Sequence, residues 1–309
     1  MTVVIVAPGQ GSQTPGFLEP WLAEPRFAEH LDALADAAGV ELRTHGTVSD
    51  ADTIRDTAIA QPLIVAASIL SLAGVLDGGR RDRIAGIAGH SVGEFAAAAG
   101  AGILDESAAM RLVATRGRAM ADAAALAETG MSAVIGADEA ELLARLDELG
   151  LDPANFNGGG QLVVAGALDA LAALQAEPPA GSRVIPLQVA GAFHTRYMAS
   201  AVERLRAATE GVAVADPTVR IWTNRDGSAV ASGADYLELL VGQVASPVRW
   251  DTTMETFAAE GITGLIELAP AGALVGLAKR GLKGLPTVAV KTPDDLAAAH
   301  ALIDQESAA

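Results

Sequence analysis

The sequence predicts an α/β fold built mainly on a parallel sheet, and three observations support this prediction. Over the first ~120 residues, short apolar runs alternate with helical patterns, as in a parallel sheet covered by helices. From about Met131 the order changes to strand, helix, strand, strand, helix, strand. After Ala190 the alternation of strands and helices resumes. We therefore expect one large α/β unit into which a smaller unit is inserted.

The elements of the large unit follow from the spacing of the apolar residues. Short apolar runs bounded by glycine or proline predict strands, and longer runs with one polar face predict helices. The expected strands are 2–7, 84–88, 219–223, 264–268 and 287–290. The expected helices are 23–38, 62–76, 93–101, 105–125, 198–211, 236–244, 254–260, 274–280 and 294–303.

A smaller unit is expected over residues 126–190. A strand in "MSAVIG" precedes an amphipathic helix, "DEAELLARLDELG", for which Asp138 is the expected N-cap. The strands "PANFN" and "QLVVAG" are joined by a tight "GGG" turn, and the helix "LDALAALQA" and the strand "RVIPLQV" follow. The order βαββαβ is that of a ferredoxin-like unit. The large unit is then formed by 1–125 and 191–309.

The composition excludes several functions. The 38 acidic and 21 basic residues give a formal charge of −17, whereas a protein that binds nucleic acid needs a cationic face. The same charge argues against an anionic membrane surface as a partner. The chain has no cysteine, so disulfides, thiolate zinc sites and a cysteine nucleophile are excluded.

Two segments bear on the cellular location. The start "MTVVIVAPGQGSQ" lacks the cationic residues and the long apolar run of a signal peptide. The uncharged run 58–76 is close to membrane-spanning length, but Gln61, Pro62, Ser68 and Ser71 interrupt it. We expect a buried helix there, and a cytoplasmic protein.

The segment "GIAGHSVGEF" at 86–95 gives the first indication of chemistry. Ser91 lies between Gly89 and Gly93, with a strand pattern before it and a helix pattern after it. In that context G-x-S-x-G predicts a nucleophile elbow, a sharp turn that exposes the serine oxygen. The bare pattern is common in ordinary turns, but the flanking strand and helix favour a nucleophile.

A serine nucleophile needs a base, and five histidines are available. His90 is adjacent to Ser91, but neighbouring side chains at a strand end point to opposite sides, so its expected role is packing. His194 follows a strand, in a glycine-punctuated loop at the domain junction, which favours it as the base. No aspartate stands out as a third member, so a carbonyl oxygen is the alternative. The remaining histidines lie in polar helices or, as a weaker candidate for the base, in a polar loop: His30, His300 and His45.

Together, these motifs resemble those of the malonyl-CoA:acyl carrier protein transacylases of bacterial fatty acid and polyketide synthesis. The resemblance runs nearly end to end, and seven short motifs occur in the right order. They are "PGQGSQ", "AQPLIVAA", "GHSVGEF", "RGRAM", "NFNGGGQLVVAG", "GAFHT" and "SPVRW". The resemblance implies an α/β-hydrolase-like core with an inserted ferredoxin-like subdomain, which agrees with the element order above.

The resemblance also implies a role for each matching catalytic residue. Ser91 would accept the acyl group, and His194 would be the general base. The main-chain carbonyl of Gln243 would steady the imidazole in place of an aspartate. The main-chain amides of Gln10 and Val92 would form the oxyanion hole.

Three further residues would bind the acyl group. Arg116 would hold the malonyl carboxylate in a two-pronged ion pair, because a carboxylate in a water-poor cleft needs a paired cation. The alternative for Arg116 is a solvated helix arginine. Gln61 would line the pocket, and Phe193 resembles the form linked with malonyl over methylmalonyl units. Departures from the family at Ala7, "GEF" and "LAPAGAL" leave the shape of the pocket open but remove no catalytic group.

Two half-reactions are implied, with malonyl-CoA as the first substrate, an acyl carrier protein as the acceptor, and no metal or redox cofactor. We expect a monomer. Carrier proteins are acidic, so docking to a chain of charge −17 would need a local cationic patch. A solvated helix end is the alternative for the candidate residues, which are Lys279, Arg280, Lys283 and Arg183.

A serine esterase or thioesterase on the same elbow is the rival enzyme. It would have an acidic third member of the triad and no buried arginine. A carrier-binding module without catalysis is the other alternative, and it predicts that Ser91→Ala leaves function intact.

Overall fold

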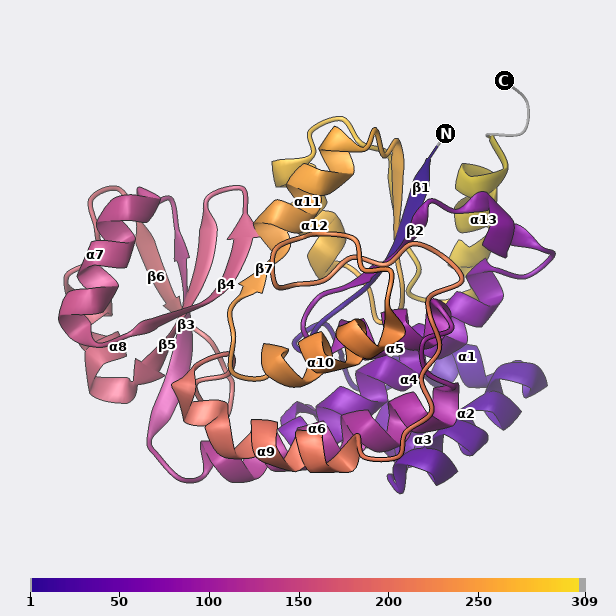
Figure 1. Cartoon of the computed structure of the whole chain (residues 1–309), viewed down its shortest axis with the longest axis horizontal. Coiled ribbons are helices and arrows are strands. Elements are labelled where there is room, and N and C mark those ends of the chain that lie inside the picture. Colours follow the sequence, from indigo (N-terminus) through magenta and orange to yellow (C-terminus); the bar gives the residue numbers. More distant parts are fainter. Residues whose placement is uncertain (1, 306–309) are drawn as a thin grey trace.

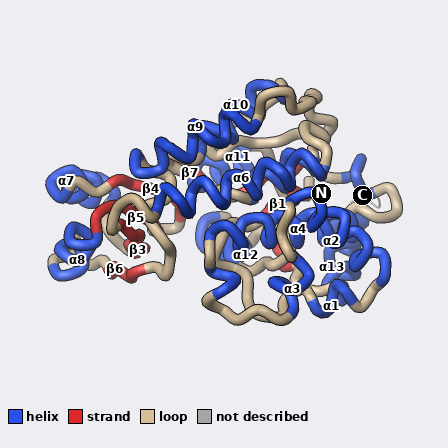
Figure 2. The backbone as a smooth tube through the Cα atoms, turned by 90° about the horizontal axis from the view of Figure 1, so that it is seen from below, coloured by secondary structure: helices blue, strands red, loops and turns tan. Residues whose placement is uncertain are grey.

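The computed structural model describes residues 2–305. It contains two β-sheets, each packed against helices (Figure 1). The larger unit contains a parallel sheet, and the smaller one contains a mainly antiparallel sheet. Figure 2 shows the smaller unit at one end of the molecule when the view is turned by 90°. The mixed α/β architecture that the sequence predicts is therefore present.

The first sheet consists of four parallel strands in the order β2-β1-β8-β9. Their bounds are β1 Val3–Ala7, β2 Gly86–Gly89, β8 Gly264–Glu267 and β9 Thr287–Ala289. The central strand β1 is fully buried, and its side chains alternate between two hydrophobic clusters, one on each face. A strand that is covered on both faces has no place for polar side chains, which explains the continuous apolar run in the sequence.

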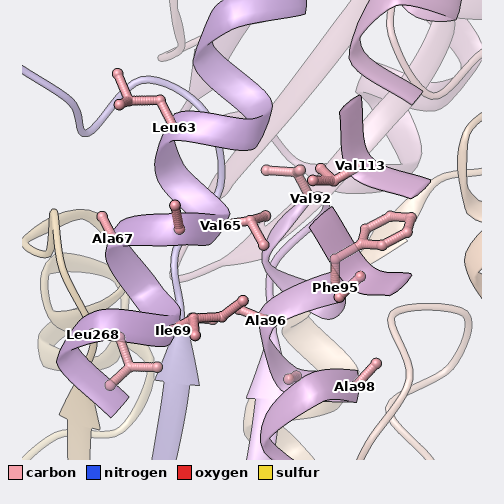
Figure 3. Close-up of a cluster of buried hydrophobic side chains, with 14 of the residues drawn as sticks. Leu63, Val65, Ala67, Ile69, Val92, Phe95, Ala96, Ala98, Val113 and Leu268 are labelled. Atoms are coloured by element: carbon pink, nitrogen blue, oxygen red, sulfur yellow. The ribbon is translucent and has the colours of Figure 1, made fainter. Parts of the chain in front are cut away.

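Helices cover both faces of this sheet. On one face lie α4 (Thr57–Val75), α5 (Gly93–Gly100) and α6 (Glu106–Ala124), and on the other lie α11 (Trp250–Ala259) and α12 (Ala273–Gly281). Figure 3 shows the first core, where Val65 and Ile69 of α4 face Ala96 of α5. The small residues of the alanine-rich α5 allow these helices to pack closely against the sheet.

Further helices surround this core. They are α1 (Glu19–Leu22), α2 (Pro25–Ala38), α3 (Leu42–Thr47), α9 (Ala199–Ala208), α10 (Gly233–Gln243) and α13 (Leu296–Asp304), with short 3₁₀ helices at Thr53–Arg55, Arg80–Arg83, Arg196–Met198 and Pro293–Asp295. The helix α10 lies beside α9 and ends at the functional site.

The second sheet has the strand order β6-β3-β5-β4-β7. Its elements are β3 (Thr129–Ile135), α7 (Glu139–Leu149), β4 (Asp152–Gly158), β5 (Gln161–Ala167), α8 (Leu168–Ala176), β6 (Arg183–Pro186) and, from the larger unit, β7 (Val248–Arg249). All pairs are antiparallel except β4 with β7. Asp138 caps α7, as expected, by accepting a hydrogen bond from the Glu141 N–H. The strand β7 ties the small sheet to the large unit.

The buried helix expected over 62–76 is confirmed, although it begins earlier. The Asp56 carboxylate accepts a hydrogen bond from the Ala58 N–H, so α4 starts at Thr57 and Pro62 lies inside it. The helix is long and apolar enough to cross a membrane, but 83% of that apolar window is buried within the structure. In residues 2–305 it is therefore a core helix.

The prediction of a strand over 219–223 is wrong. Only isolated bridges form there, one between Ile221 and Ile87 and one between Trp222 and Ala229. The chain leaves the sheet because Asn224 is hydrogen-bonded to the turn that follows β2. The elements α3 and β7 were not expected, since runs of six and two residues are too short to show a clear period.

Candidate active site

The turn between β2 and α5 presents Ser91. Its φ of 52° lies in the left-handed region, which residues with a β-carbon rarely adopt. A β-carbon on Gly89 would lie 2.1 Å from the Gly93 carbonyl carbon, and one on Gly93 would lie 2.3 Å from the Ala7 oxygen. Neither position can therefore hold a side chain. This geometry is that of the nucleophile elbow which the motif predicts.

His194 lies beside the serine. Its Nε2 is 2.7 Å from the Ser91 Oγ, and its Nδ1 is 2.9 Å from the main-chain oxygen of Gln243. A carbonyl oxygen only accepts, so Nδ1 carries the proton and Nε2 is free to accept the serine proton. The residue His194 is 4% exposed, and its backbone φ is 62°. Two hydrogen bonds thus connect Ser91, His194 and the Gln243 carbonyl in series, and among residues 2–305 no carboxylate is hydrogen-bonded to the imidazole.

The other histidines point elsewhere. His90 lies 3.0 Å from the Asn157 Oδ1 and packs edge-on against the Trp250 ring, as its expected packing role requires. Three more are bound to partners away from the serine: His30 to Glu106, His45 to Ser49 and His300 to the Gly74 oxygen. Among the five histidines, all within the described residues, only His194 hydrogen-bonds the Ser91 hydroxyl.

Arg116 projects from α6 into the same site and is 1% exposed. Its Nη1 donates to the Gln61 Oε1 at 2.7 Å, and its Nη2 donates to the Gln243 Oε1 at 2.9 Å. The Nη2 also lies 3.4 Å from the Ser91 Oγ. These partners are neutral, and over residues 2–305 no carboxylate forms an ion pair with this guanidinium. A buried cation without an anionic partner is costly, so the site is suited to an anionic ligand.

The burial changes the acid–base properties of the site. Burial lowers the pKa of His194 to about 3, and the charge of Arg116 acts in the same direction. Burial likewise lowers the pKa of Arg116 to about 10, against the opposing charge of Glu94. Near neutral pH the imidazole is therefore neutral and the guanidinium is charged.

Two main-chain amides are available for an oxyanion. The Val92 N–H follows the serine, and the Gln10 N–H lies in the loop after β1. Within residues 2–305 neither donates to a protein acceptor. That loop lies against the elbow, since a β-carbon on Gly9 would be 3.0 Å from the His90 ring. Unsatisfied donors beside a nucleophile are what an oxyanion hole requires.

A cavity of about 530 Å³ opens onto these groups between the two units. Its lining includes the expected site residues Gln10, Gln61, Ser91, Val92, Arg116, Phe193, His194 and Arg280. Met131 and Val163 of the second sheet form part of the opposite wall. Both units therefore line the cleft, and each contributes apolar and polar side chains to it.

Two buried residues of the site were not expected. The carboxylate oxygens of Glu94 accept hydrogen bonds from the Asn224 N–H and the Gln243 Nε2. The Asn224 side chain in turn binds both Gly89 and Ser91. A lone acidic residue in the alanine-rich helix α5 was a signal for Glu94. No comparable signal exists for Asn224, because it lies 133 residues from the serine that it contacts.

The cationic candidates are only partly brought together. Lys279 and Arg280 lie in the last turn of α12 and Lys283 follows it, all exposed, with Arg280 at the cavity. Arg183 begins β6, which is three strand spacings from β4, or about 14 Å. The α12 end thus forms a cluster of three cations, from which Arg183 is separate.

Gly93, two residues after the serine, offers a test of the elbow. Gly93→Ala would place a methyl group against the backbone of Ala7, and we expect it to destabilise the fold by about 3 kcal/mol, as overpacked sites do. Gly242→Ala in α10 is the control, since its β-carbon would meet nothing within 4 Å. Chemical unfolding measures both free energies. Equal stability of the two variants would contradict the close approach.

The low pKa of His194 predicts an unusual pH dependence. An ordinary imidazole, with a pKa of about 6.5, would lose the base form as the pH falls from 7 to 5. A folded pKa of about 3 keeps the imidazole neutral over that range, so the rate of Ser91 acylation should stay flat. Stopped-flow measurements from pH 5 to 7 check this, and Arg116→Gln should move the acid limb to higher pH. A wild-type limb centred near 6.5 would refute the predicted environment.

Comparisons with known proteins agree with this geometry. A family model described as an acyl transferase domain matches residues 4–299. The malonyl CoA-acyl carrier protein transacylase of Mycobacterium tuberculosis strain H37Rv is 49% identical over 298 residues, which cover 95% of this chain and 98% of that protein. The Escherichia coli K12 protein of the same name is 34% identical, over 95% of this chain and 97% of its own length.

Solved structures give the same result. The crystal structure of MCAT from Mycobacterium tuberculosis matches with a TM-score of 0.94 and 47% identity, over 97% of this chain and 100% of that one. A structure titled as a type II PKS acyl-carrier protein in complex with its malonyl-transacylase matches with a TM-score of 0.90 and 31% identity, over 97% and 99%. The chain therefore belongs to the acyl transferase family and, within it, to the malonyl-CoA:acyl carrier protein transacylases.

Proposed function

We propose that the protein transfers the malonyl group from malonyl-CoA to the phosphopantetheine thiol of an acyl carrier protein, through an ester on Ser91. One observation carries this proposal. The Arg116 guanidinium is buried without an anionic partner and lies 3.4 Å from the serine oxygen, which itself lies 2.7 Å from the base His194. A substrate that has a thioester at one end and a carboxylate at the other matches this pair of groups.

The first half-reaction forms the ester. His194 Nε2 takes the proton of the Ser91 hydroxyl while Oγ attacks the thioester carbon, and the N–H groups of Gln10 and Val92 donate to the oxyanion. When the oxyanion collapses, the C–S bond breaks and the imidazolium gives its proton to the departing CoA thiolate. The second half-reaction runs in reverse with the carrier thiol as nucleophile. No oxidation state changes, so the reaction itself requires no redox cofactor, and the amides supply the electrophilic assistance that a metal would otherwise give.

Arg116 selects and protects the acyl group. Gln61 and Gln243 occupy only two of its five N–H groups and fix the plane of the guanidinium, which suits a two-pronged bond to a carboxylate. An acyl group that is anchored at its far end leaves water little room beside the ester, which favours transfer over hydrolysis. The Phe193 side chain lines the cavity, where its ring would crowd an α-methyl group.

The partner would be an acidic carrier protein that docks at the cationic end of α12. Lys279, Arg280 and Lys283 support this because they form an exposed cluster at the end of α12, where Arg280 lines the cavity, whereas Arg183 lies on β6, outside this cluster. The solved complex of a relative with an acyl-carrier protein supports the same class of partner. The proposal includes a cytoplasmic monomer, which size-exclusion chromatography with light scattering would test.

The proposal also covers the division of the chain. Residues 1–125 and 191–309 would form an α/β-hydrolase-like core, which a parallel sheet with a nucleophile elbow after one strand supports. Residues 126–190 would form a ferredoxin-like subdomain, which the βαββαβ order in one antiparallel sheet supports. The short strand β7 then joins the two.

Intact mass after mixing with malonyl-CoA tests the acyl-enzyme. We expect one malonyl group on the wild type, stable until a pantetheine thiol is added, and no adduct on Ser91→Ala. Arg116→Gln should slow malonyl loading about 100-fold, as the loss of a charge contact in a buried site does, and remove the preference over acetyl-CoA. Arg118→Gln, an exposed arginine of the same helix, is the control. An adduct that water removes as quickly as it forms would instead favour a thioesterase.

Charge reversal tests the docking site. Lys279→Glu combined with Lys283→Glu should raise the KM for the carrier protein about tenfold and leave Ser91 loading from malonyl-CoA unchanged. Arg111→Glu combined with Arg118→Glu, on the exposed part of α6, gives the same change in net charge and should affect neither. Steady-state kinetics with purified carrier protein measure the difference. If loading and carrier KM change together, the cluster is not a docking site.

A further inference from the structure

Asn224 is 1% exposed, and every one of its polar groups is hydrogen-bonded. Its Nδ2 donates to the Gly89 oxygen at 2.6 Å, and its Oδ1 accepts from the Ser91 N–H at 2.7 Å. Its own N–H donates to the Glu94 Oε1 at 2.7 Å, and its carbonyl accepts from the Arg249 N–H at 2.7 Å. One side chain therefore binds both peptide groups that lead into the nucleophile.

The amide group fits this position in one orientation only. The Gly89 oxygen can only accept and the Ser91 N–H can only donate, so the nitrogen of Asn224 must face the first and its oxygen the second. An aspartate would put a carboxylate oxygen against the Gly89 carbonyl, and an aliphatic residue would leave both groups unpaired in the interior. The position therefore requires an amide side chain, and an apolar side chain of the same size would not replace it.

Glu94 holds the same assembly from the other side. One carboxylate oxygen accepts from the Asn224 N–H and the other from the Gln243 Nε2. The Gln243 Nε2 also donates to the main-chain oxygen of Ser91 at 3.0 Å, and the main-chain oxygen of Gln243 accepts from His194. Burial raises the pKa of Glu94 to about 8, although both hydrogen bonds oppose the shift. The carboxyl group thus connects the residues that hold the serine to those that hold the base.

We propose that Asn224 is a positioning residue for acyl transfer and that Glu94 keeps it in place. This inference rests on the proposed reaction at Ser91. The serine has φ 52°, which is unfavourable for a residue with a β-carbon, so the turn must be held by its surroundings. The two bonds from Asn224 fix the peptide groups that precede this residue. With the turn fixed, the serine oxygen stays within reach of the imidazole, and the Val92 N–H stays free for the oxyanion.

Single-turnover loading of Ser91 from malonyl-CoA tests the proposal. In Asn224→Ala we expect the first-order rate constant of loading to fall about 100-fold, as displacement of a reacting group by about 1 Å does. The half-saturating malonyl-CoA concentration and the preference over acetyl-CoA should not change, because Arg116 keeps its contacts. Glu94→Gln offers one acceptor oxygen in place of two, and we expect its rate constant of loading to fall about tenfold.

Ser68→Ala is the matched control. It removes a buried hydrogen bond, from the Ser68 Oγ to the Ala269 oxygen, without touching the turn. It should lower the melting temperature and leave the loading rate constant unchanged. The amplitude of loading separates the two effects, since unfolded protein loses amplitude whereas a mispositioned serine loses rate.

The inference would be overturned if Asn224→Ala were loaded with malonyl at the wild-type rate. If Asn224→Ala does not fold, loading of Glu94→Gln at the wild-type rate would overturn it. A fluorophosphonate probe, which labels activated serines whatever their acyl donor, keeps the test independent of the substrate. If wild-type protein reacts with the probe but takes no malonyl group, the proposed function fails. Slower labelling of Asn224→Ala by the probe would still support the positioning role, and equal labelling would refute it.

Discussion

The sharp turn at Ser91 is the constraint on which the rest of the site depends. It requires a serine whose backbone lies in the left-handed region and, two residues away on each side, a position without a side chain. Side chains are excluded because Gly93 approaches the Ala7 oxygen and Gly89 approaches the start of α5. Those contacts fix the helix against the central strand of the sheet. The same turn brings the serine oxygen to the His194 imidazole and leaves the Val92 N–H unpaired. Backbone geometry and chemistry are thus set together, as is usual where strain is stored at a functional site.

Burial makes the electrostatics of this site strong. Within the described residues 2–305, the guanidinium of Arg116 hydrogen-bonds only amide and hydroxyl oxygens, and its charge helps to lower the pKa of His194. A malonyl carboxylate would offset that charge, so the cleft is electrically balanced only when a dicarboxylic acyl group is bound. Glu94 is too deeply buried to serve as that anion, and its oxygens are already occupied. In the proposed reaction, the cation that would bind the substrate carboxylate thus also lowers the pKa of the base that activates Ser91.

Local patterns in the sequence explain which parts of the site could be predicted. Ser91 was identifiable because the glycines that its turn needs lie two residues away, and His194 because few histidines follow a strand at a domain junction. Asn224 was not, since its importance arises from contacts with segments about 130 residues away, and only its lone acidic character in an alanine-rich helix marked Glu94. The strand expected over 219–223 failed for the same reason: hydrogen bonds to the elbow override local propensity. Arg183 lies on β6 and not on α12, so its part in docking stays a prediction.

A structure of the malonyl-enzyme would show whether Arg116 holds the far end of the acyl group. We expect an ester on the Ser91 Oγ, with the free carboxylate about 2.8 Å from two nitrogens of Arg116. We also expect the ester carbonyl oxygen within hydrogen-bond distance of the Val92 and Gln10 amides. A carboxylate that points into solvent, or an acyl group on another residue, would rule out this mode of binding.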